Sequence, residues 1–188
     1  KSLDLNNKKI VFPARLLFDK GIKEFLESAE ILSKDYPDWK FILAGACDYK
    51  NPSAISKKTL DKYLKNKNIE WLGYVKNMKE VYINSAIVCL PSYREGMPKS
   101  LMEAAAIGRP VVTTRTVGCK DSIIENSTGY LVPIKDSYSL ALAIKKLIDT
   151  PLLRKQFGVN GRSFAENNFD LKTVQNNILG IYMEIISK

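Results

Sequence analysis

Residues 86–114, AIVCLPSYREGMPKSLMEAAAIGRPVVTT, are the stretch that decides the fold of this chain. The short apolar run at its start, residues 86–90, is typical of a parallel strand that is covered on both faces. Pro91 ends this run, and Pro98 suits the first turn of a helix, where its missing N–H costs nothing. Gly108 is expected to end that helix before a second buried strand begins. The stretch therefore predicts a strand, a loop, a helix and another strand.

Two glutamates of this stretch fall where sheets of this kind bind ligands. Glu95 lies in the loop at the carboxyl end of the first strand, where open parallel sheets bind their ligands. Glu103 lies one turn beyond Lys99 and Ser100 on a helix whose free N–H groups and dipole suit a phosphate. A carboxylate beside such a helix end can accept paired hydrogen bonds from the hydroxyls of a ribose or a hexose. The spacing suits a nucleotide-sugar site, and equally an ordinary loop followed by a surface Lys99–Glu103 ion pair.

The residues from Glu95 to Glu103, EGMPKSLME, together with GRPVV at residues 108–112, resemble the Glu-x7-Glu signature of the retaining group 1 glycosyltransferases. Members of this family have the GT-B fold, in which two Rossmann-like halves face each other across a cleft. The resemblance covers nearly the whole chain, in the order of the family's carboxyl-terminal half. It implies that Glu103 binds the ribose hydroxyls of the donor, and that Glu95, the catalytic candidate, faces the transferred sugar. It also implies that the donor diphosphate and sugar are lined by Gly96, Met97, Pro98, Lys99, Ser100 and Leu101.

Strands and helices alternate along the rest of the chain. Further buried strands are predicted over residues 10–14, 39–44, 69–75 and 128–133. Helices are predicted over residues 22–35, 51–66, 78–85, 136–149, 151–167 and 171–186. In the first of these, Ile31 is expected to widen the buried face formed at helical spacing by Phe25, Ala29 and Leu32. The alternation predicts an α/β fold in a single domain, a Rossmann-like parallel sheet with helices on both faces.

A loop with two cations follows the first predicted strand. Arg15 and Lys20 lie near the N-terminus of the next helix, and two cations with a helix dipole can offset the charge of a diphosphate. An arginine and a lysine in a loop are weak evidence alone, but they match the diphosphate clamp of the family, which implies donor binding for both. In the family this clamp takes the place of a metal ion in neutralising the leaving diphosphate. We therefore expect neither a metal nor a cofactor.

Three further residues are candidates for a base pocket. Gly45 follows the second strand at a tight turn where backbone can approach a ligand. By the family resemblance, Tyr74 and Val75 lie where backbone groups form part of this pocket, although Tyr74 equally suits a packing role. No GxGxxG motif is present, which argues against a dinucleotide site. Gly118-Cys119 stands where many members of the family have a glycine pair near the donor, so the contact of this loop with the donor stays open.

Composition restricts the functions open to this chain. Its 188 residues suffice for one domain with a full core, and 45% hydrophobic with 26% charged residues is ordinary for a globular protein. No run approaches the roughly 20 apolar residues that a membrane helix needs, and no signal peptide is evident. The chain has no histidine, which excludes Ser-His and Cys-His catalytic pairs within it and most zinc sites. Its three cysteines form no CxxC pair and are predicted to be reduced thiols in a cytoplasmic protein.

The formal net charge of +9 is the second compositional signal. Lysines are densest on one predicted helix, at Lys57, Lys58, Lys62, Lys65 and Lys67. Such a face is in most cases merely solvated, and contact with an anionic membrane surface is the main alternative. No basic and aromatic module of an RNA-binding type is present, so nucleic acid is not expected as a partner. The predicted location is the cytoplasm, with peripheral contact at the inner face of the membrane as an alternative.

The family resemblance implies the donor-binding half of a transferase that moves a sugar from a nucleotide diphosphate sugar with retention at the anomeric carbon. Likeness to surface-polysaccharide enzymes favours a UDP-sugar and a bacterial glycan, with a lipid-linked acceptor as one partner. We expect the acceptor-binding amino-terminal half to be missing from this chain, and the isolated half to bind nucleotide weakly and turn over little. Two alternatives stay open: a nucleotide-sugar epimerase of the same fold, against which the Glu-x7-Glu region argues, and a non-catalytic nucleotide-binding module.

Overall fold

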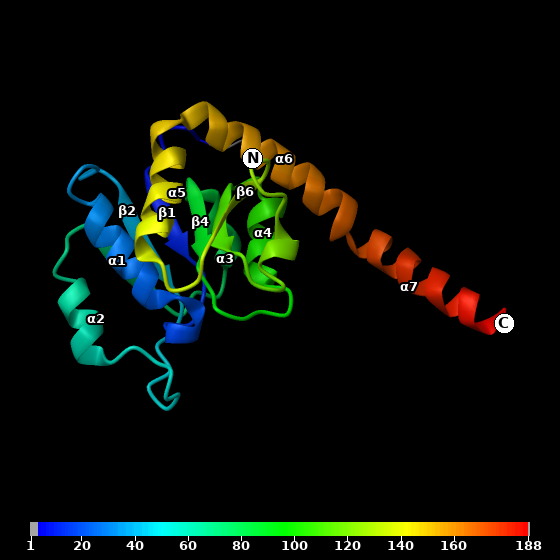
Figure 1. The fold of residues 1–188 in the computed structure, drawn as a ribbon, viewed down its shortest axis with the longest axis horizontal. Helices are drawn as coiled ribbons and strands as arrows, with labels where there is room; N and C mark the ends of the chain where they lie inside the picture. The colour runs from blue at the N-terminus through cyan, green and yellow to red at the C-terminus, as the bar shows by residue number, and fades with distance from the viewer. Residues whose placement is uncertain (1–3, 188) are drawn as a thin grey trace.

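A computed structural model of the chain describes residues 4–187. Six parallel strands form one sheet in the order β3-β2-β1-β4-β5-β6 (Figure 1). The strands are β1 (Lys9–Phe12), β2 (Lys40–Ala44), β3 (Ile69–Gly73), β4 (Ile87–Leu90), β5 (Val111–Thr114) and β6 (Gly129–Val132). The chain runs outward from β1 to β3 and then crosses back to β4, so the order reverses between β1 and β4. Ligands of open parallel sheets bind at the carboxyl ends of the strands flanking such a switch point.

Residues 4–187 form seven α-helices, most of which pack around the sheet, and this confirms the predicted α/β, Rossmann-like class. They are α1 (Ile22–Leu32), α2 (Lys57–Tyr63), α3 (Met78–Ile83), α4 (Lys99–Ala106), α5 (Ser137–Asp149), α6 (Pro151–Asn168) and α7 (Leu171–Ile186). Helix α1 packs on α5, and α4 packs on α6. The two central strands carry the core, because every residue of β4 and residues 10–12 of β1 are buried. Strands covered on both faces in this way read as continuous apolar runs, which is why the sequence predicted them.

Two expectations about helices are wrong. Helix α2 begins at Lys57 rather than residue 51, because Ser56 caps it by accepting a hydrogen bond from the Thr59 N–H at 3.1 Å. The segment before it turns instead, with the Asn51 side chain accepting from the Ser53 N–H at 2.9 Å, a bond that competes with helix formation. Ile31 is 40% exposed and does not widen the buried face of α1. The buried face of α1 therefore depends on Phe25 and its helical neighbours.

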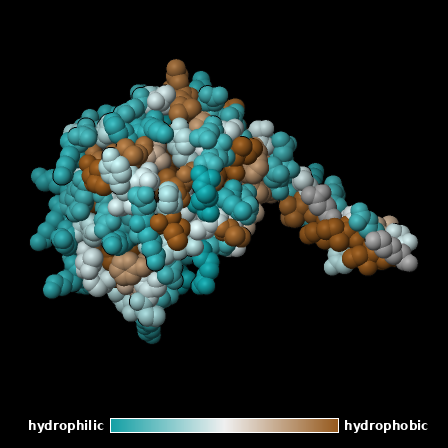
Figure 2. Space-filling view, in the orientation of Figure 1, coloured by the Kyte–Doolittle hydropathy of each residue, from teal (hydrophilic) through white to brown (hydrophobic). Residues whose placement is uncertain are grey.

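Helix α7 leaves the body of the domain after α6 and carries the chain to its C-terminus (Figure 1). Its apolar side chains are exposed, and Figure 2 shows them as a brown stripe along the helix. The exposed set is Leu171, Val174, Ile178, Leu179, Ile181, Tyr182, Met183, Ile185 and Ile186. Among residues 4–187 no helix combines the length and apolarity needed to span a bilayer.

Arg109 is a buried cation that links the turn after α4 to the C-terminal end of α3. Its side chain is 1% exposed, and its guanidinium donates to the last carbonyls of α3, Tyr82 O at 2.8 Å and Ile83 O at 3.1 Å. Burial lowers the pKa of Arg109 from its ordinary value, because desolvation disfavours the charged form. The hydrogen bonds to the helix end offset this cost, since carbonyls at a helix C-terminus attract cations.

We expect the Arg109→Met substitution to lower the free energy of unfolding by about 2–4 kcal/mol, because it removes two hydrogen bonds that a buried guanidinium donates to the end of α3. Urea denaturation followed by circular dichroism measures this change. Lys23→Met is the control, since Lys23 lies on the surface in an ion pair with Glu27 and its loss should cost no more than about 1 kcal/mol. Equal losses in the two variants would contradict the role assigned to Arg109.

Candidate functional site

The loops that follow β1 and β4 meet at the carboxyl edge of the sheet and are joined by an ion pair. The Nζ atom of Lys20 lies 2.6 Å from Oε1 of Glu95, and the two side chains are 24% and 14% exposed. Lys20 ends the short 3₁₀ helix η1 (Phe18–Lys20), and Gly21 after it adopts φ +76°, which turns the chain into α1. The structure thus brings together the lysine of the predicted clamp and the catalytic candidate.

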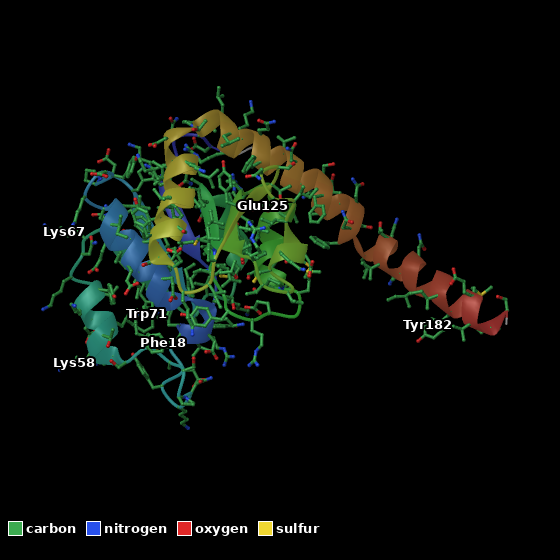
Figure 3. The ribbon with its side chains drawn as sticks, in the orientation of Figure 1. Phe18, Lys58, Lys67, Trp71, Glu125 and Tyr182 are labelled. Carbon is green, nitrogen blue, oxygen red and sulfur yellow. The ribbon has the colours of Figure 1, made fainter. Side chains whose placement is uncertain are left out.

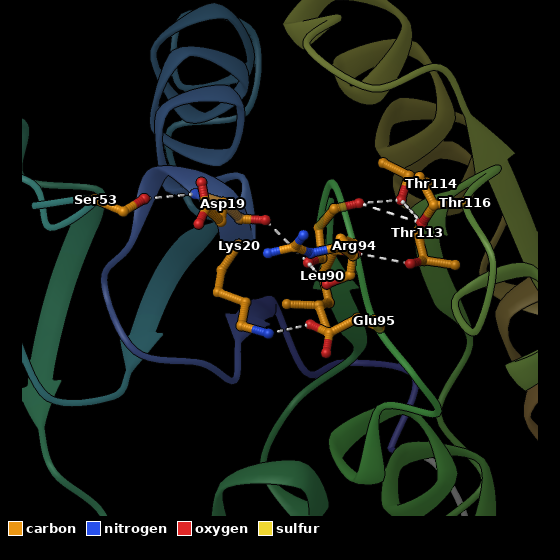
Figure 4. Close-up of polar contacts among 10 residues, drawn as sticks. Asp19, Lys20, Ser53, Leu90, Arg94, Glu95, Thr113, Thr114 and Thr116 are labelled. Atoms are coloured by element: carbon orange, nitrogen blue, oxygen red, sulfur yellow. Dashed lines mark hydrogen bonds and ion pairs between the residues drawn. The ribbon is translucent and has the colours of Figure 1, made fainter. Parts of the chain in front are cut away.

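Hydrogen bonds from both sides hold the loop that carries Glu95 (Figure 4). On the α1 side, the Asp19 carbonyl accepts from the Tyr93 N–H at 2.8 Å and from the Ser92 hydroxyl at 3.0 Å. On the β5 side, the Thr113 hydroxyl donates to the Leu90 carbonyl at 2.7 Å, and the Thr114 hydroxyl donates to the Ser92 carbonyl. Ser92 and the two threonines are buried, so these bonds form away from water and fix the loop firmly.

The loop after β5 supports the Glu95 loop through Gly118. This residue adopts φ +79°, and a Cβ atom built on it would lie 2.1 Å from the Gly96 carbonyl oxygen and 2.5 Å from that of Glu95. The Gly118 N–H donates to Asp121 at 3.0 Å, and its carbonyl accepts from the Ser122 hydroxyl at 2.7 Å. Only glycine allows such an approach. Gly118 therefore contacts the backbone of the Glu95 loop.

The second predicted carboxylate lines a cavity beside this loop. Glu103, on α4, is 38% exposed and pairs with Lys99 at 3.6 Å. Together with Ser100 it borders a cavity of about 620 Å³ that extends to Pro13 after β1 and to the start of α3 at residues 76–79. The predicted neighbours Lys99, Ser100 and Glu103 thus share one surface, and that surface is hollow. This volume falls in the range of small-molecule sites.

Tyr82 is a residue of this cavity that the sequence analysis missed. Its side chain is 1% exposed, and burial followed by the nearby Glu103 carboxylate raises the pKa of Tyr82 well above its ordinary value. The phenol therefore stays protonated beside the carboxylate. In the sequence Tyr82 sits among the apolar positions of a short helix, where an aromatic residue is indistinguishable from a core residue.

The second cation of the predicted clamp lies apart from the Lys20–Glu95 pair. Arg15 is about half exposed, and its guanidinium lies 3.4 Å from Asp48, a residue of the loop after β2 that was not predicted. An exposed pair at this distance is weak and can exchange with another anion. The structure does not hold Arg15 against Lys20, although the same loop carries both.

The remaining predicted residues divide into accessible and enclosed ones. Gly96, Met97 and Lys99 are exposed, whereas Pro98 and Leu101 are buried. The Leu101 side chain belongs to the core and its N–H donates to the Pro98 carbonyl at 3.0 Å, so its side chain is not accessible from the surface. The sequence pattern could not separate it from its neighbours on the same helix.

The predicted base-pocket residues lie at the ends of β2 and β3. Tyr74 is 78% exposed, which rules out the packing role, while Val75 packs partly buried against the core. The Gly45 carbonyl accepts a hydrogen bond from the indole N–H of Trp71 at 2.9 Å, a contact that the sequence did not reveal. Figure 3 labels Trp71 at the lower end of the sheet in this view, near Phe18 of η1.

Comparison with known proteins decides the family. The sequence model of the family "Glycosyl transferases group 1" matches residues 1–164. The chain belongs to this family. Among curated relatives, the capsular polysaccharide biosynthesis glycosyltransferase CapM of Staphylococcus aureus is 30% identical over 178 residues, 94% of this chain and 46% of that protein. A second relative, N,N'-diacetylbacillosaminyl-diphospho-undecaprenol alpha-1,3-N-acetylgalactosaminyltransferase of Campylobacter jejuni, is 33% identical over 99% of this chain and 47% of its own length.

Solved structures agree on the fold of this group 1 chain. Anabaena Alr3699/HepE, solved in complex with UDP, superposes with a TM-score of 0.85 at 20% identity over 95% of this chain and 49% of its own. The C-terminal domain of the group 1 protein LpcC from Francisella tularensis gives 0.79 at 26% identity, covering 90% of this chain and 96% of that domain. The chain spans about half the length of the curated relatives it matches. Its fold is therefore that of one Rossmann-like part of GT-B glycosyltransferases.

We expect Gly118→Ala to destabilise the domain by about 2–3 kcal/mol, because a Cβ atom would overlap two carbonyls and φ +79° disfavours alanine. Gly180→Ala is the control, since Gly180 lies in α7 with nothing within 4 Å of an added Cβ. That variant should be neutral or more stable by up to about 1 kcal/mol. Thermal and urea denaturation measure both, and the same stability in the two variants would disprove the tight contact of Gly118 with the Glu95 loop.

Proposed function

We propose that this chain is the donor-binding half of a glycosyltransferase that uses a nucleoside diphosphate sugar. The observation that supports this most is the position of the Lys20–Glu95 pair at the switch point between β1 and β4, beside the cavity bordered by Glu103. Helices α1 and α4 both begin at this edge, so their positive ends and Lys20 favour an anion there. A diphosphate at this point leaves Glu95 on the sugar and Glu103 on the ribose hydroxyls.

In the proposed reaction an acceptor oxygen bonds to the anomeric carbon of the sugar, the bond to the diphosphate breaks, and the acceptor proton leaves to solvent or a base. Lys20 and Arg15 stabilise the negative charge that develops on the leaving diphosphate. Without a ligand, Lys20 pairs with Glu95 and Arg15 pairs with Asp48. In the proposal the diphosphate replaces these carboxylates as the partner of both cations. These cations make a metal ion unnecessary, and we infer retention at the anomeric carbon from the Glu-x7-Glu spacing.

We infer that the nucleotide is UDP and that the product belongs to a bacterial surface glycan. HepE is described in complex with UDP, and the relatives CapM and the Campylobacter enzyme are named for capsular polysaccharide synthesis and for a diphospho-undecaprenol acceptor. The open cavity of about 620 Å³ has room for a nucleoside whose ribose meets Glu103. Tyr74 and Val75 directly precede Lys76, which borders this cavity, and we assign them to the base.

We further propose that an amino-terminal half packs against this domain through α7. The relatives are about twice as long as the matched region. The apolar stripe of α7 is larger than the scattered apolar residues of an ordinary surface, so it favours burial against a partner. The acceptor site then lies in that half, across a cleft from Glu95.

The charge of the domain favours peripheral contact with an anionic membrane. Between residues 50 and 67 the chain has six lysines and one acid, Asp61, a net charge of +5 against +9 for the whole chain. We name these six residues the lysine surface: Lys50, Lys57, Lys58, Lys62, Lys65 and Lys67. All six are exposed and, within residues 4–187, none forms an ion pair. Figure 3 shows Lys58 and Lys67 projecting from the side that carries α2. A lipid-linked acceptor would place the enzyme at such a membrane.

Calorimetric titration tests the donor site. We expect the domain to bind UDP, and Glu103→Ala and Arg15→Ala each to weaken binding by tenfold or more, about 1.4 kcal/mol, because a ribose or diphosphate contact is lost. Glu166→Ala and Arg162→Ala are the controls, since they form a comparable surface pair on α6. Saturable UDP binding that survives in both site variants would rule out this assignment.

Sedimentation with vesicles tests the lysine surface. We expect binding to phosphatidylglycerol-containing vesicles that falls as salt rises, and no binding to pure phosphatidylcholine. Replacing Lys58, Lys62 and Lys65 by Gln should remove most of the binding. The same replacement at the exposed Lys34, Lys155 and Lys172 changes the net charge equally and should remove little. An equal loss in both triple variants would mean that only net charge matters.

A further inference from the structure

Glu24 is a buried acid for which the proposed donor site has no use. It lies in the first turn of α1, and only 4% of its surface is exposed. Its Oε1 atom accepts a hydrogen bond from the Tyr93 hydroxyl at 2.6 Å, and its Oε2 atom has no partner among the described residues. Glutamate is rarely buried unless it is paired, because desolvating a carboxylate costs several kcal/mol. The hydrogen bond from Tyr93 is therefore the interaction that offsets the cost of burying Glu24.

Tyr93 connects three loops at the carboxyl edge of the sheet. It precedes Glu95 by two residues, its N–H donates to the Asp19 carbonyl, and its hydroxyl reaches Glu24 in the first turn of α1. The Nζ atom of Lys135, from the loop after β6, lies 5.4 Å from the centre of its ring. Asp19 is the neighbour of Lys20 in the chain. Tyr93 therefore ties the backbone before Glu95 to the segment that carries Lys20 at two separate points.

The phenol keeps its proton in this environment. Burial first, and then the hydrogen bond to Glu24, raise the pKa of Tyr93 well above its ordinary value. The bond thus persists as an O–H donor to a carboxylate, a charge-assisted bond that is stronger than a neutral one. A fixed anchor of this kind matters because small displacements of a reacting group cost large factors in rate.

We propose that Glu24 and Tyr93 form a positioning pair that holds the Glu95 loop against Lys20 and so sets the place of the Glu95 carboxylate. Neither residue touches the donor in this proposal. Since Glu95 acts on the sugar only in the proposed function, the catalytic consequence rests on that function, whereas the effect on the loop does not. The pair should therefore influence turnover more than nucleotide affinity.

Two measurements on the natural full-length protein test the pair. Hydrogen exchange followed by mass spectrometry reports the mobility of residues 91–98, and we expect Tyr93→Phe to speed exchange there at least fivefold. Release of UDP from the probe UDP-N-acetylgalactosamine reports turnover, as water replaces the diphosphate at the anomeric carbon and UDP and a proton leave. Here Tyr93→Phe should lower kcat tenfold or more and change the calorimetric Kd for UDP less than threefold. Glu24→Gln keeps an acceptor and should stay within about threefold of the wild type in kcat.

Tyr36→Phe is the matched control. The Tyr36 hydroxyl donates to Asp149 at 2.5 Å and Lys145 lies 5.0 Å from its ring centre, the same combination of carboxylate and cation at a distance from the site. This variant should change neither exchange in residues 91–98 nor turnover. If Tyr93→Phe does not fold, the double variant Glu24→Leu with Tyr93→Phe removes both polar partners, which is far less costly than removing one.

The outcomes separate the two proposals. Unchanged exchange in residues 91–98 in the folded Tyr93 variant, single or double, overturns the positioning pair. Faster exchange with wild-type kcat overturns its effect on catalysis. A wild-type protein that neither binds UDP nor releases it from the probe contradicts the proposed function instead, and the exchange measurement still decides whether the pair holds the loop. Faster exchange together with lowered kcat and unchanged UDP affinity supports the pair.

Discussion

The Lys20–Glu95 ion pair is the interaction on which the arrangement of the site depends. Both groups are largely removed from water, so each charge needs the other to offset its desolvation. The pair therefore fixes the distance between the loops after β1 and β4. The backbone segments next to the pair are in close contact as well. A Cβ atom on Gly21 would lie 2.1 Å from the Pro91 carbonyl oxygen, which shows how tightly the start of α1 abuts the end of β4.

Charged and neutral bonds have different places around this pair. Apart from the Tyr93–Glu24 bond, the side-chain contacts that support the Glu95 loop are hydroxyl–carbonyl bonds of Ser92, Thr113 and Thr114, which are buried and neutral. Glu103, which borders the cavity, and Arg15, in the loop after β1, are instead charged and partly exposed. Neutral buried bonds do not depend on the charge of a ligand, whereas a charged ligand can readily replace one partner of a half-exposed ion pair. The scaffold can therefore stay unchanged while an anion rearranges only the ion pairs.

Local patterns in the sequence specified most of the fold. Helix α7 begins and ends as predicted, and Asp136 caps α5 by accepting from the Ser139 N–H, because caps and helical spacing are local signals. The position of Glu95 at the carboxyl edge of the sheet followed from the strand ending at Leu90 and the loop after it. Ile31 was misplaced because apolar spacing does not reveal which helix face a neighbouring element covers. The Leu101 side chain lies in the core because adjacent residues of one helix share a motif but not a direction.

The contacts that the sequence did not reveal join residues far apart in the chain. The Tyr93–Glu24 bond spans 69 positions, and Trp71 reaches the Gly45 carbonyl across 26. A tyrosine in a loop and a glutamate in a helix each suit an exposed position, and only the tertiary fold shows that they bury each other. The groups that we propose to face a ligand could be predicted from a motif, because a ligand would constrain their spacing in the chain. The groups that hold them in place are constrained by the folded chain alone, and nothing in the local sequence records that constraint.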